Sequence, residues 1–365
     1  MLCYEYPPIG GGAAKVVDGL TRELIRKGHE IHLLTMGFRN LPSFEVIDKL
    51  HIHRVKCVRL KESICTFPEM MTYIFSAVFY GVKLIKKHKF QINHTHFIFP
   101  DGALAYLLFK ITGLKYIITA HGSDVPGYNP NRFKLLHKFL RPIWQLIVRN
   151  SSRMIFPSNS LHNLFKNVKP DSDGIIIPNG INLDKFSPLV EKQKKILVVT
   201  RMFERKGVQY LLKALEGFEH DYQINIVGDG PYLSFLKKIA EDSKLNVNFL
   251  GFIDNQSCEL KKLYEESSIF IITSEAENFP IVLLEAMVAG MAIITTLGTG
   301  CEEVVGSSAL LIETKNSDEI RNALKKLIDN PQLIQKLQTA SRNRVEDLFA
   351  WRSIANRYSS IYRNI

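Results

Sequence analysis

The chain has 365 residues, of which 46% are hydrophobic and 23% charged, a composition typical of globular proteins that excludes a disordered chain. This length suits two domains, and 47 basic against 36 acidic residues give a formal net charge of +11. The five cysteines are scattered and form no C-x-x-C pair, which argues against a disulfide scaffold or a cysteine zinc site and favours a reducing compartment.

Apolar, strand-like runs alternate with segments of helical period from end to end. The predicted strands of the front half are residues 29–35, 90–96, 115–121, 153–157 and 174–178, with a helix over 13–27. Those of the back half are 195–200, 222–227, 247–250, 269–273 and 292–296, with helices over 210–215, 233–240 and 281–289. This alternation predicts an α/β fold of two doubly wound domains with parallel sheets. A Pro-Asn-Gly turn at 178–180 places the hinge near residues 179–188.

A glycine-rich loop follows the first predicted strand, which should end near Glu5. Only about five residues precede Pro7, so this strand looks short. Gly10, Gly11 and Gly12 then open the helix over 13–27, where backbone N–H groups can approach an anion; a tight turn would need the same glycines. A nicotinamide-dinucleotide site would also need an acid at the end of the second strand. That strand ends in Thr35, which argues against a dehydrogenase.

His121 lies just past a predicted strand, in the run His-Gly-Ser-Asp that ends at Asp124. A histidine there can hydrogen-bond a sugar or a phosphate, and Asp124 can orient it. A polar strand end capped by a turn explains the same residues equally well. His94 and His96 share one face of a strand, but no further ligands accompany them, so we expect no metal there.

Two cations and two acids occupy loops of the back half. Arg201 and Lys206 lie between a strand and a helix, where they can neutralise a diphosphate, although basic residues are also common in solvated turns. Glu277 lies just before a helix that Pro280 starts, and Glu285 lies about one turn further in. Such acids can bind vicinal hydroxyls or simply complement the helix dipole.

Taken in order, these segments resemble the family 4 retaining glycosyltransferases of the GT-B fold. The matching stretches are PPIGGGAAKVVDGLTRELIRKGHEIHLLT, HGSDV, PNGINLDKF, VTRMFERKGVQYLLKAL, IVGDGP, SEAENFPIVLLEAMVAGMAIITT and GCEEVV. The resemblance implies two Rossmann-like domains facing across a cleft. It assigns residues 1–180 to an acceptor-side domain, 181–345 to a nucleotide-sugar-binding domain, and 346–365 to a helix that crosses back to the first domain.

The resemblance also implies residue roles. Arg201 and Lys206 would hold the donor diphosphate, and Glu277 would contact the transferred sugar. The implied catalytic residues are His121, Arg201, Lys206 and Glu277, and the implied donor-binding residues are Gly11, Gly12, Arg201, Lys206, Asn278, Phe279, Val282, Glu285 and Glu303. Family members need no divalent metal and no cofactor beyond the nucleotide sugar, for which UDP or GDP is expected. Two departures from the family pattern are Pro280 in place of glycine and Thr299-Gly300 in place of a paired glycine.

The implied function is a hexosyltransferase-type enzyme that acts with retention on a lipid-linked or glycan acceptor, in the synthesis of cell-surface polysaccharide, glycolipid or glycoconjugate. One alternative is a sugar-nucleotide epimerase of the same fold. Another, of a different class, is a catalytically silent basic protein that binds membranes. The intact set of Arg201, Lys206, Glu277 and Glu285 argues against the silent protein.

The excess of positive charge lies in the front half, because residues 1–180 hold 24 basic and 12 acidic residues, whereas residues 181–365 hold 23 and 24. A helix over 131–149 carries Lys134, Lys138, Arg141 and Arg149 on one stripe, with Trp144 among its apolar residues; the segment 68–89 ends in further lysines. Both fit docking on an anionic membrane, and core-facing helices with a solvated basic side explain them equally well.

We expect a cytoplasmic protein, peripheral on the membrane if docking holds. Nucleic acid is not an expected partner, because no recognised binding module is present.

Overall fold

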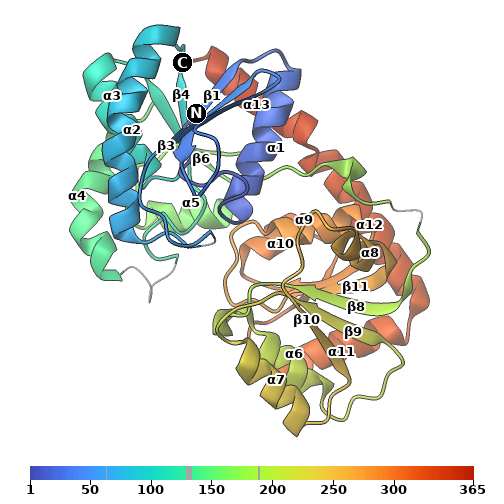
Figure 1. Ribbon diagram of the computed structural model, residues 1–365. Helices are drawn as coiled ribbons and strands as arrows, with labels where there is room; N and C mark the ends of the chain where they lie inside the picture. The colour runs from blue at the N-terminus through green and yellow to red at the C-terminus, as the bar shows by residue number, and fades with distance from the viewer. Residues whose placement is uncertain (63, 129–133, 188–189) are drawn as a thin grey trace. The chain divides into compact units, whose positions relative to one another are not determined.

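The computed structural model describes residues 1–62, 64–128, 134–187 and 190–365, without the side chains of 134–140. The chain divides into two compact units, one formed by residues 1–180 and 351–365 and the other by residues 181–350 (Figure 1). Each unit has a mainly parallel sheet with helices on both sides, so the predicted α/β class is confirmed.

The front unit is built on strands β1 (Ile31–Met36), β2 (Phe44–Ile47), β3 (Leu50–Val55), β4 (Asn93–His96), β5 (Tyr116–Thr119), β6 (Arg153–Phe156) and β7 (Gly174–Ile176). They form two runs, β1-β3-β2 and β4-β5-β6-β7. Isolated parallel bridges from Leu2 to Leu34 and to Thr95 join these runs. The first strand predicted before Pro7 is therefore reduced to bridges at one residue.

The helices of the front unit are α1 (Gly12–Arg26), α2 (Phe67–His88), α3 (Asp101–Thr112), α4 (Lys134–Asn150), α5 (Asn159–Lys166) and α13 (Trp351–Arg363). Figure 1 shows α2, α3 and α4 on one side of the sheet and α1 with α13 on the other. α1 buries Val16, Val17, Leu20 and Leu24, an apolar stripe at helical spacing.

Of the two interpretations of the segment 131–149, Trp144 favours the core-facing helix. Its side chain is 4% exposed, and its indole N–H donates to the carbonyl of Asp124 at 3.2 Å. The ring also packs on Phe165, with centroids 5.0 Å apart. Trp144 therefore anchors α4 to its own unit. Of the predicted basic stripe, Lys134 and Lys138 lie outside the residues whose side chains are described, and Arg141 and Arg149 are exposed.

The back unit contains a six-stranded parallel sheet in the order β10-β9-β8-β11-β12-β13. Its strands are β8 (Gln193–Val199), β9 (Gln223–Val227), β10 (Val247–Gly251), β11 (Ser267–Ile271), β12 (Ala292–Thr296) and β13 (Leu310–Ile312). Numbered along the chain, this order is 3-2-1-4-5-6, the order of the doubly wound nucleotide-binding fold. The strand order therefore reverses between β8 and β11.

Helices cover both faces of this sheet (Figure 1). They are α6 (Val208–Leu215), α7 (Leu233–Asp242), α8 (Cys258–Glu266), α9 (Ile281–Val288), α10 (Gly300–Val305), α11 (Ser317–Ile328) and α12 (Pro331–Phe349), with short 3₁₀ turns at η1 (Leu183–Lys185) and η2 (Glu204–Lys206). One core packs Ile196 and Val198 against α6, α7 and α11. The other packs Leu197 and Val199 against α8, α9 and α10. The β8 side chains alternate between the two cores, as expected of a strand buried on both faces.

The hairpin of β2 and β3 and the short strand β13 were missed by the sequence interpretation. In β2, Phe44, Val46 and Ile47 are all exposed, so the strand lacks the alternation that marks a half-buried one. β13 has only three residues. The ten strands that the sequence predicts between residues 29 and 296 are confirmed, with ends shifted by up to three residues.

We expect Gly19→Ala to destabilise the protein. Trp351, at the start of α13, lies over Gly19 of α1, and a Cβ atom on Gly19 would lie 2.3 Å from the indole Nε1. Overpacking of this kind costs about 1–3 kcal/mol, which denaturant unfolding can measure. Gly12→Ala in the same helix is the control, since a Cβ there meets nothing within 4 Å. Equal stability of both variants would show that Trp351 is not held against α1.

Candidate functional site

The loops that follow β8 and β11 carry the predicted diphosphate and sugar ligands. Arg201 and Lys206 follow β8, and Glu277 follows β11. These strands are hydrogen-bonded neighbours in the sheet, for example through Ile196 and Ile269. In doubly wound sheets, ligands bind beyond the carboxyl ends of the strands where the order reverses. The topology of the back unit therefore brings these loops to its expected ligand site.

Lys206 and Glu277 form a buried ion pair between their Nζ and Oε1 atoms. Lys206 ends the turn η2, where its carbonyl accepts a hydrogen bond from Thr273 Oγ1 at 3.1 Å. Gly207 follows with φ +70°, and a Cβ there would lie 2.1 Å from the Thr273 carbonyl oxygen. Only glycine permits this approach, which fixes the backbone of Lys206 against the end of β11.

The charge state of Glu277 depends on its neighbours. Burial alone would raise the pKa of this carboxyl group, but the charge and hydrogen bond of Lys206 hold the pKa below its ordinary value, with a contribution from Arg205. Glu277 is therefore ionised at neutral pH. The pair places one negative and one positive group, both with most of their surface removed from water, at the reversal point of the sheet.

The loop that carries Glu277 is held by backbone contacts from its surroundings. The N–H group of Gly300, the first residue of α10, donates to the Glu277 carbonyl at 2.9 Å. A Cβ on Gly300 would lie 1.6 Å from the Asn278 carbonyl oxygen, so this glycine is required for the approach. Thr299 stands where the family pattern has the first glycine of a pair. Its hydroxyl caps α10 by accepting a hydrogen bond from the Cys301 N–H at 3.2 Å.

Glu285 pairs with a different cation. It lies within α9, 1% exposed, and forms an ion pair with Lys185 of η1. Its second oxygen accepts a hydrogen bond from the Tyr264 hydroxyl at 3.1 Å. A ribose that binds Glu285 would therefore share the carboxylate with these two groups or replace one of them. Lys185 and Tyr264 were not among the predicted site residues.

The other predicted donor-binding residues have different surroundings. Asn278 is buried, whereas Val282 and Glu303 are half-buried on α9 and α10. The Phe279 ring packs edge-on against Phe349, with centroids 5.4 Å apart, so this side chain belongs to the core and supports the loop. Arg201 is exposed, and its guanidinium lies 5.6 Å from the Phe203 ring centroid.

Arg205 is a cation that sequence reasoning missed. Its carbonyl accepts from the Glu275 N–H at 2.9 Å, which ties the β8 loop to the β11 loop. Its Nη1 atom is buried and has no hydrogen-bond partner among the described residues. The sequence feature that could have indicated Arg205 is its position directly before Lys206.

His121 of the front unit is neutral. Burial lowers the pKa of its imidazole to about 3, and its Nε2 atom lies 3.0 Å from Nδ1 of His96. Of the two interpretations of the run from His121 to Asp124, the contacts favour a strand end capped by a turn. Asp124 accepts from the backbone N–H groups of His121, Gly122 and Ile98, at 3.0, 2.9 and 2.8 Å. It shapes the loop rather than the side chain.

Gly11 and Gly12 start α1, with Gly11 as the N-cap residue. A Cβ atom on either would meet nothing within 4 Å, so packing does not require glycine at these two positions. Their place at a helix N-terminus is one where an anion can bind.

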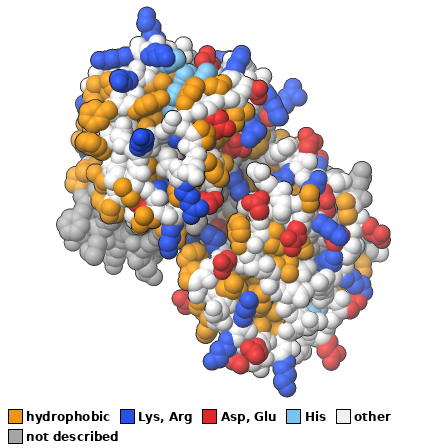
Figure 2. Space-filling view, viewed as in Figure 1, with side chains coloured by type: hydrophobic (Ala, Val, Ile, Leu, Met, Phe, Trp, Pro, Cys, Tyr) orange, Lys and Arg blue, Asp and Glu red, His pale blue; other side chains and the backbone are white. Residues whose placement is uncertain are grey.

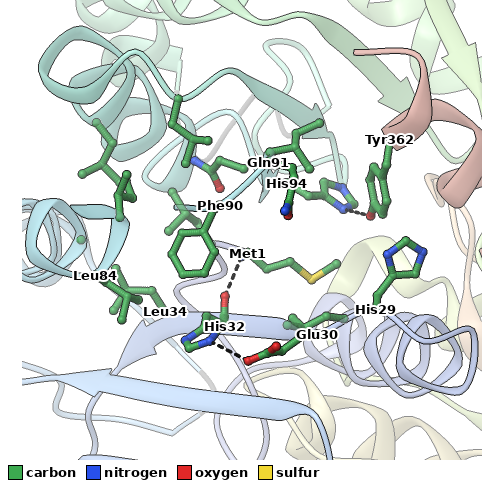
Figure 3. Close-up of a pocket in the computed structure, with 18 of the residues that line it drawn as sticks. Met1, His29, Glu30, His32, Leu34, Leu84, Phe90, Gln91, His94 and Tyr362 are labelled. Atoms are coloured by element: carbon green, nitrogen blue, oxygen red, sulfur yellow. Dashed lines mark hydrogen bonds and ion pairs between the residues drawn. The ribbon is translucent and has the colours of Figure 1, made fainter. Parts of the chain in front are cut away.

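The front unit also has an open pocket of about 320 Å³ near the amino ends of β1 and β4 (Figure 3). Met1, His29, Glu30, Phe90 and Tyr362 are among the residues that line it. None of the predicted site residues belongs to its lining, so the pocket is not the predicted donor site.

Two family models match the chain. Residues 10–185 match the model described as glycosyltransferase family 4, and residues 181–344 match the one described as glycosyl transferases group 1. The N-acetyl-alpha-D-glucosaminyl L-malate synthase of Bacillus anthracis is 26% identical over 99% of this chain and 95% of its own length.

Solved structures share the fold. The sucrose-phosphate synthase of Thermosynechococcus elongatus superposes with a TM-score of 0.83 at 22% identity, covering 97% of this chain and 93% of that one. The HepE protein of Anabaena, solved with UDP-glucose, gives a TM-score of 0.77 at 16% identity, covering 100% and 98%. The fold class is thus that of the GT-B glycosyltransferases. With both halves matched, the chain belongs to the family 4, group 1 glycosyltransferases.

Proposed function

We propose that this glycosyltransferase moves a sugar from a UDP-linked donor, with retained configuration, to a glycan or lipid-linked acceptor. The observation that carries the proposal is the buried pair of Lys206 and Glu277 at the reversal point of the back sheet. A cation and a carboxylate held together there fit a substrate that carries both a diphosphate and sugar hydroxyls.

Departure of the nucleotide is the step that these cations assist. When the bond from the sugar to the diphosphate breaks, negative charge builds up on the diphosphate. Lys206, Arg201 and Arg205 supply positive charge on the loop where the diphosphate would lie. Each such group contributes about 3 kcal/mol to the stabilisation of the transition state. Because side chains provide this charge, we propose that transfer needs no divalent metal.

The two carboxylates have separate tasks in this proposal. Glu277, ionised beside Lys206, accepts hydrogen bonds from hydroxyls of the transferred sugar. Glu285 accepts from the ribose hydroxyls, which take the place of Lys185 or Tyr264 on its oxygens. The roles of His121, Gly11 and Gly12 at the donor stay predictions.

Two comparisons support the choice of a UDP-linked donor. HepE was solved with UDP-glucose, and the Bacillus anthracis synthase is named for an N-acetylglucosaminyl group. UDP-glucose and UDP-N-acetylglucosamine are therefore the first donors to test. Synthesis of a polysaccharide, glycolipid or glycoconjugate remains the pathway class that we propose.

A membrane-bound acceptor fits the surface of the front unit. Phe75 and Phe79 of α2 are 71% and 65% exposed, and Lys83, Lys86, Lys87 and Lys89 are exposed at the end of the helix. Figure 2 shows hydrophobic side chains gathered over this part of the unit. Exposed aromatic residues beside lysines suit the interface of an anionic bilayer.

A cytoplasmic, peripheral location follows from this proposal. Among the described residues, no helix has the length and hydropathy to cross a bilayer.

We expect Lys206→Ala to lower kcat by at least a hundredfold, because the leaving diphosphate loses a buried cation. The double variant Lys206→Met with Glu277→Gln removes both charges, so that neither is left buried alone, and should stay folded but inactive. Lys194→Ala, which removes an exposed lysine paired with Asp221, is the matched control and should keep full activity. Wild-type turnover by folded Lys206→Ala would overturn the assignment.

A screen of thermal unfolding with UDP-, GDP- and ADP-sugars tests which nucleotide the donor carries. A donor at 100 times its Kd adds about 2.7 kcal/mol of stability, and we expect this gain with UDP-sugars. Glu285→Gln should weaken the effect, whereas Lys194→Ala should not. Stabilisation by a GDP-sugar alone would show that the proposed base is wrong.

Liposome flotation tests the membrane surface. We expect the protein to float with vesicles rich in phosphatidylglycerol and not with neutral ones. Replacement of Phe75 and Phe79 by serine should reduce flotation without loss of stability, since both rings are exposed. Phe235→Ser, at a 50% exposed phenylalanine of α7, is the control. Equal flotation of all proteins, or none by wild type, would contradict docking through α2.

A further inference from the structure

A cluster of histidines lies on β1 and β3 of the front unit, outside the proposed donor site. Of the chain's eleven histidines, His32, His51 and His53 lie on these two strands. His88, the last residue of α2, lies beside them, with its ring centroid 4.3 Å from that of His32. Nothing in the proposed transfer reaction uses this cluster.

The sheet itself brings three candidate ligands together. His32 and His51 are register partners on the parallel strands β1 and β3. Glu30 precedes His32 by two residues, so both side chains point to the same face. The Glu30 Oε1 atom lies 3.3 Å from His51 Nε2 and 3.5 Å from His32 Nε2, and all three ligand atoms lie within 4.8 Å of one another. Figure 3 shows the side chains of Glu30 and His32 facing each other, with their contact drawn as a dashed line.

These separations suit a shared ion better than hydrogen bonds. Hydrogen bonds from nitrogen to oxygen span about 2.7–3.2 Å, so both contacts are longer than usual. In a tetrahedral site with bonds of about 2.0–2.1 Å to nitrogen and oxygen, neighbouring ligand atoms lie about 3.4 Å apart. The two contacts from Glu30 match that spacing. The His32 and His51 rings are stacked with centroids 4.3 Å apart, and their ligand atoms lie within 4.8 Å of each other.

The surroundings of His32 orient it for such a role. Its Nδ1 atom lies 3.0 Å from His53 Nε2, and His53 Nδ1 lies 2.9 Å from the Tyr80 hydroxyl. If Nδ1 of His32 donates to His53, its Nε2 carries a lone pair directed at Glu30 and His51. A hydrogen bond behind the ligating ring is the usual support of a metal-bound histidine.

We propose that Glu30, His32 and His51 bind a zinc-class divalent ion, with water or His88 as the fourth ligand. Glu30 is exposed and His51 half-buried, which leaves the ion a path from solvent. The ligands lie at or just before the amino ends of β1 and β3, whereas ligands of doubly wound sheets bind at the carboxyl ends. The ion would therefore join two strands and stabilise the front unit, independently of the proposed sugar transfer.

The test is titration of the chelator-treated full-length protein with Zn²⁺ and with Co²⁺. We expect one ion per chain, a rise in melting temperature with Zn²⁺, and intense visible absorption bands of tetrahedral Co²⁺. His51→Gln and Glu30→Gln should each weaken binding at least tenfold and remove the Co²⁺ bands. His88→Gln distinguishes the fourth ligand, since it changes the bands only if His88 contributes.

The control is His220→Gln, a half-buried histidine of the back unit, which should bind as wild type does. Folding of each variant is checked by its melting temperature without metal. Binding that survives both His51→Gln and Glu30→Gln, or wild-type protein that takes up no stoichiometric ion, would overturn the proposal. The result is separable from the proposed function, because metal uptake is read without any sugar donor.

Discussion

Attraction between one ammonium and one carboxylate, both largely removed from water, joins the two loops of the candidate site in the back unit. Lys206 and Glu277 come from loops after neighbouring strands, and each would be costly to bury alone. The pair offsets that cost, and close backbone approaches at Gly207 and Gly300 hold its two loops in place. A substrate with a diphosphate and hydroxyls would offer Lys206 an anion and would offer Glu277 hydrogen-bond donors. The fold thus keeps two reactive charges in position by using each to neutralise the other.

Much of this arrangement could be predicted from the sequence, because the residues that carry it mark element boundaries. Apolar runs gave the buried strands, and the glycines and Pro280 marked where loops turn into helices. With the positions of β8 and β11 known, Lys206 and Glu277 fall at the reversal of the sheet. The stretches around Arg201, Lys206, Glu277 and Glu285 then resembled the family 4 glycosyltransferases, and the family models confirmed this resemblance.

What could not be predicted are contacts between residues distant in the sequence whose partners have no periodic pattern. Lys185 lies 100 residues before Glu285, and nothing local to Lys185 shows that it pairs with this carboxylate. The sequence left two roles open for Asp124, because backbone donors leave no mark on side-chain identity. It likewise left two environments open for Trp144, since an amphipathic helix has the same pattern whether its apolar face meets lipid or the core of its own unit.

The packing of Trp351 on α1 has a consequence for biosynthesis. The front unit comprises residues 1–180 and 351–365, so its hydrophobic core includes Ile354, Ala355 and Tyr358, which are synthesised after the whole of the back unit. The back unit, in contrast, is continuous in the chain and can fold before α13 has been made. During translation, the nascent front unit therefore waits with part of its apolar surface uncovered. Chaperones that shield such surfaces would meet this intermediate before α13 emerges from the ribosome.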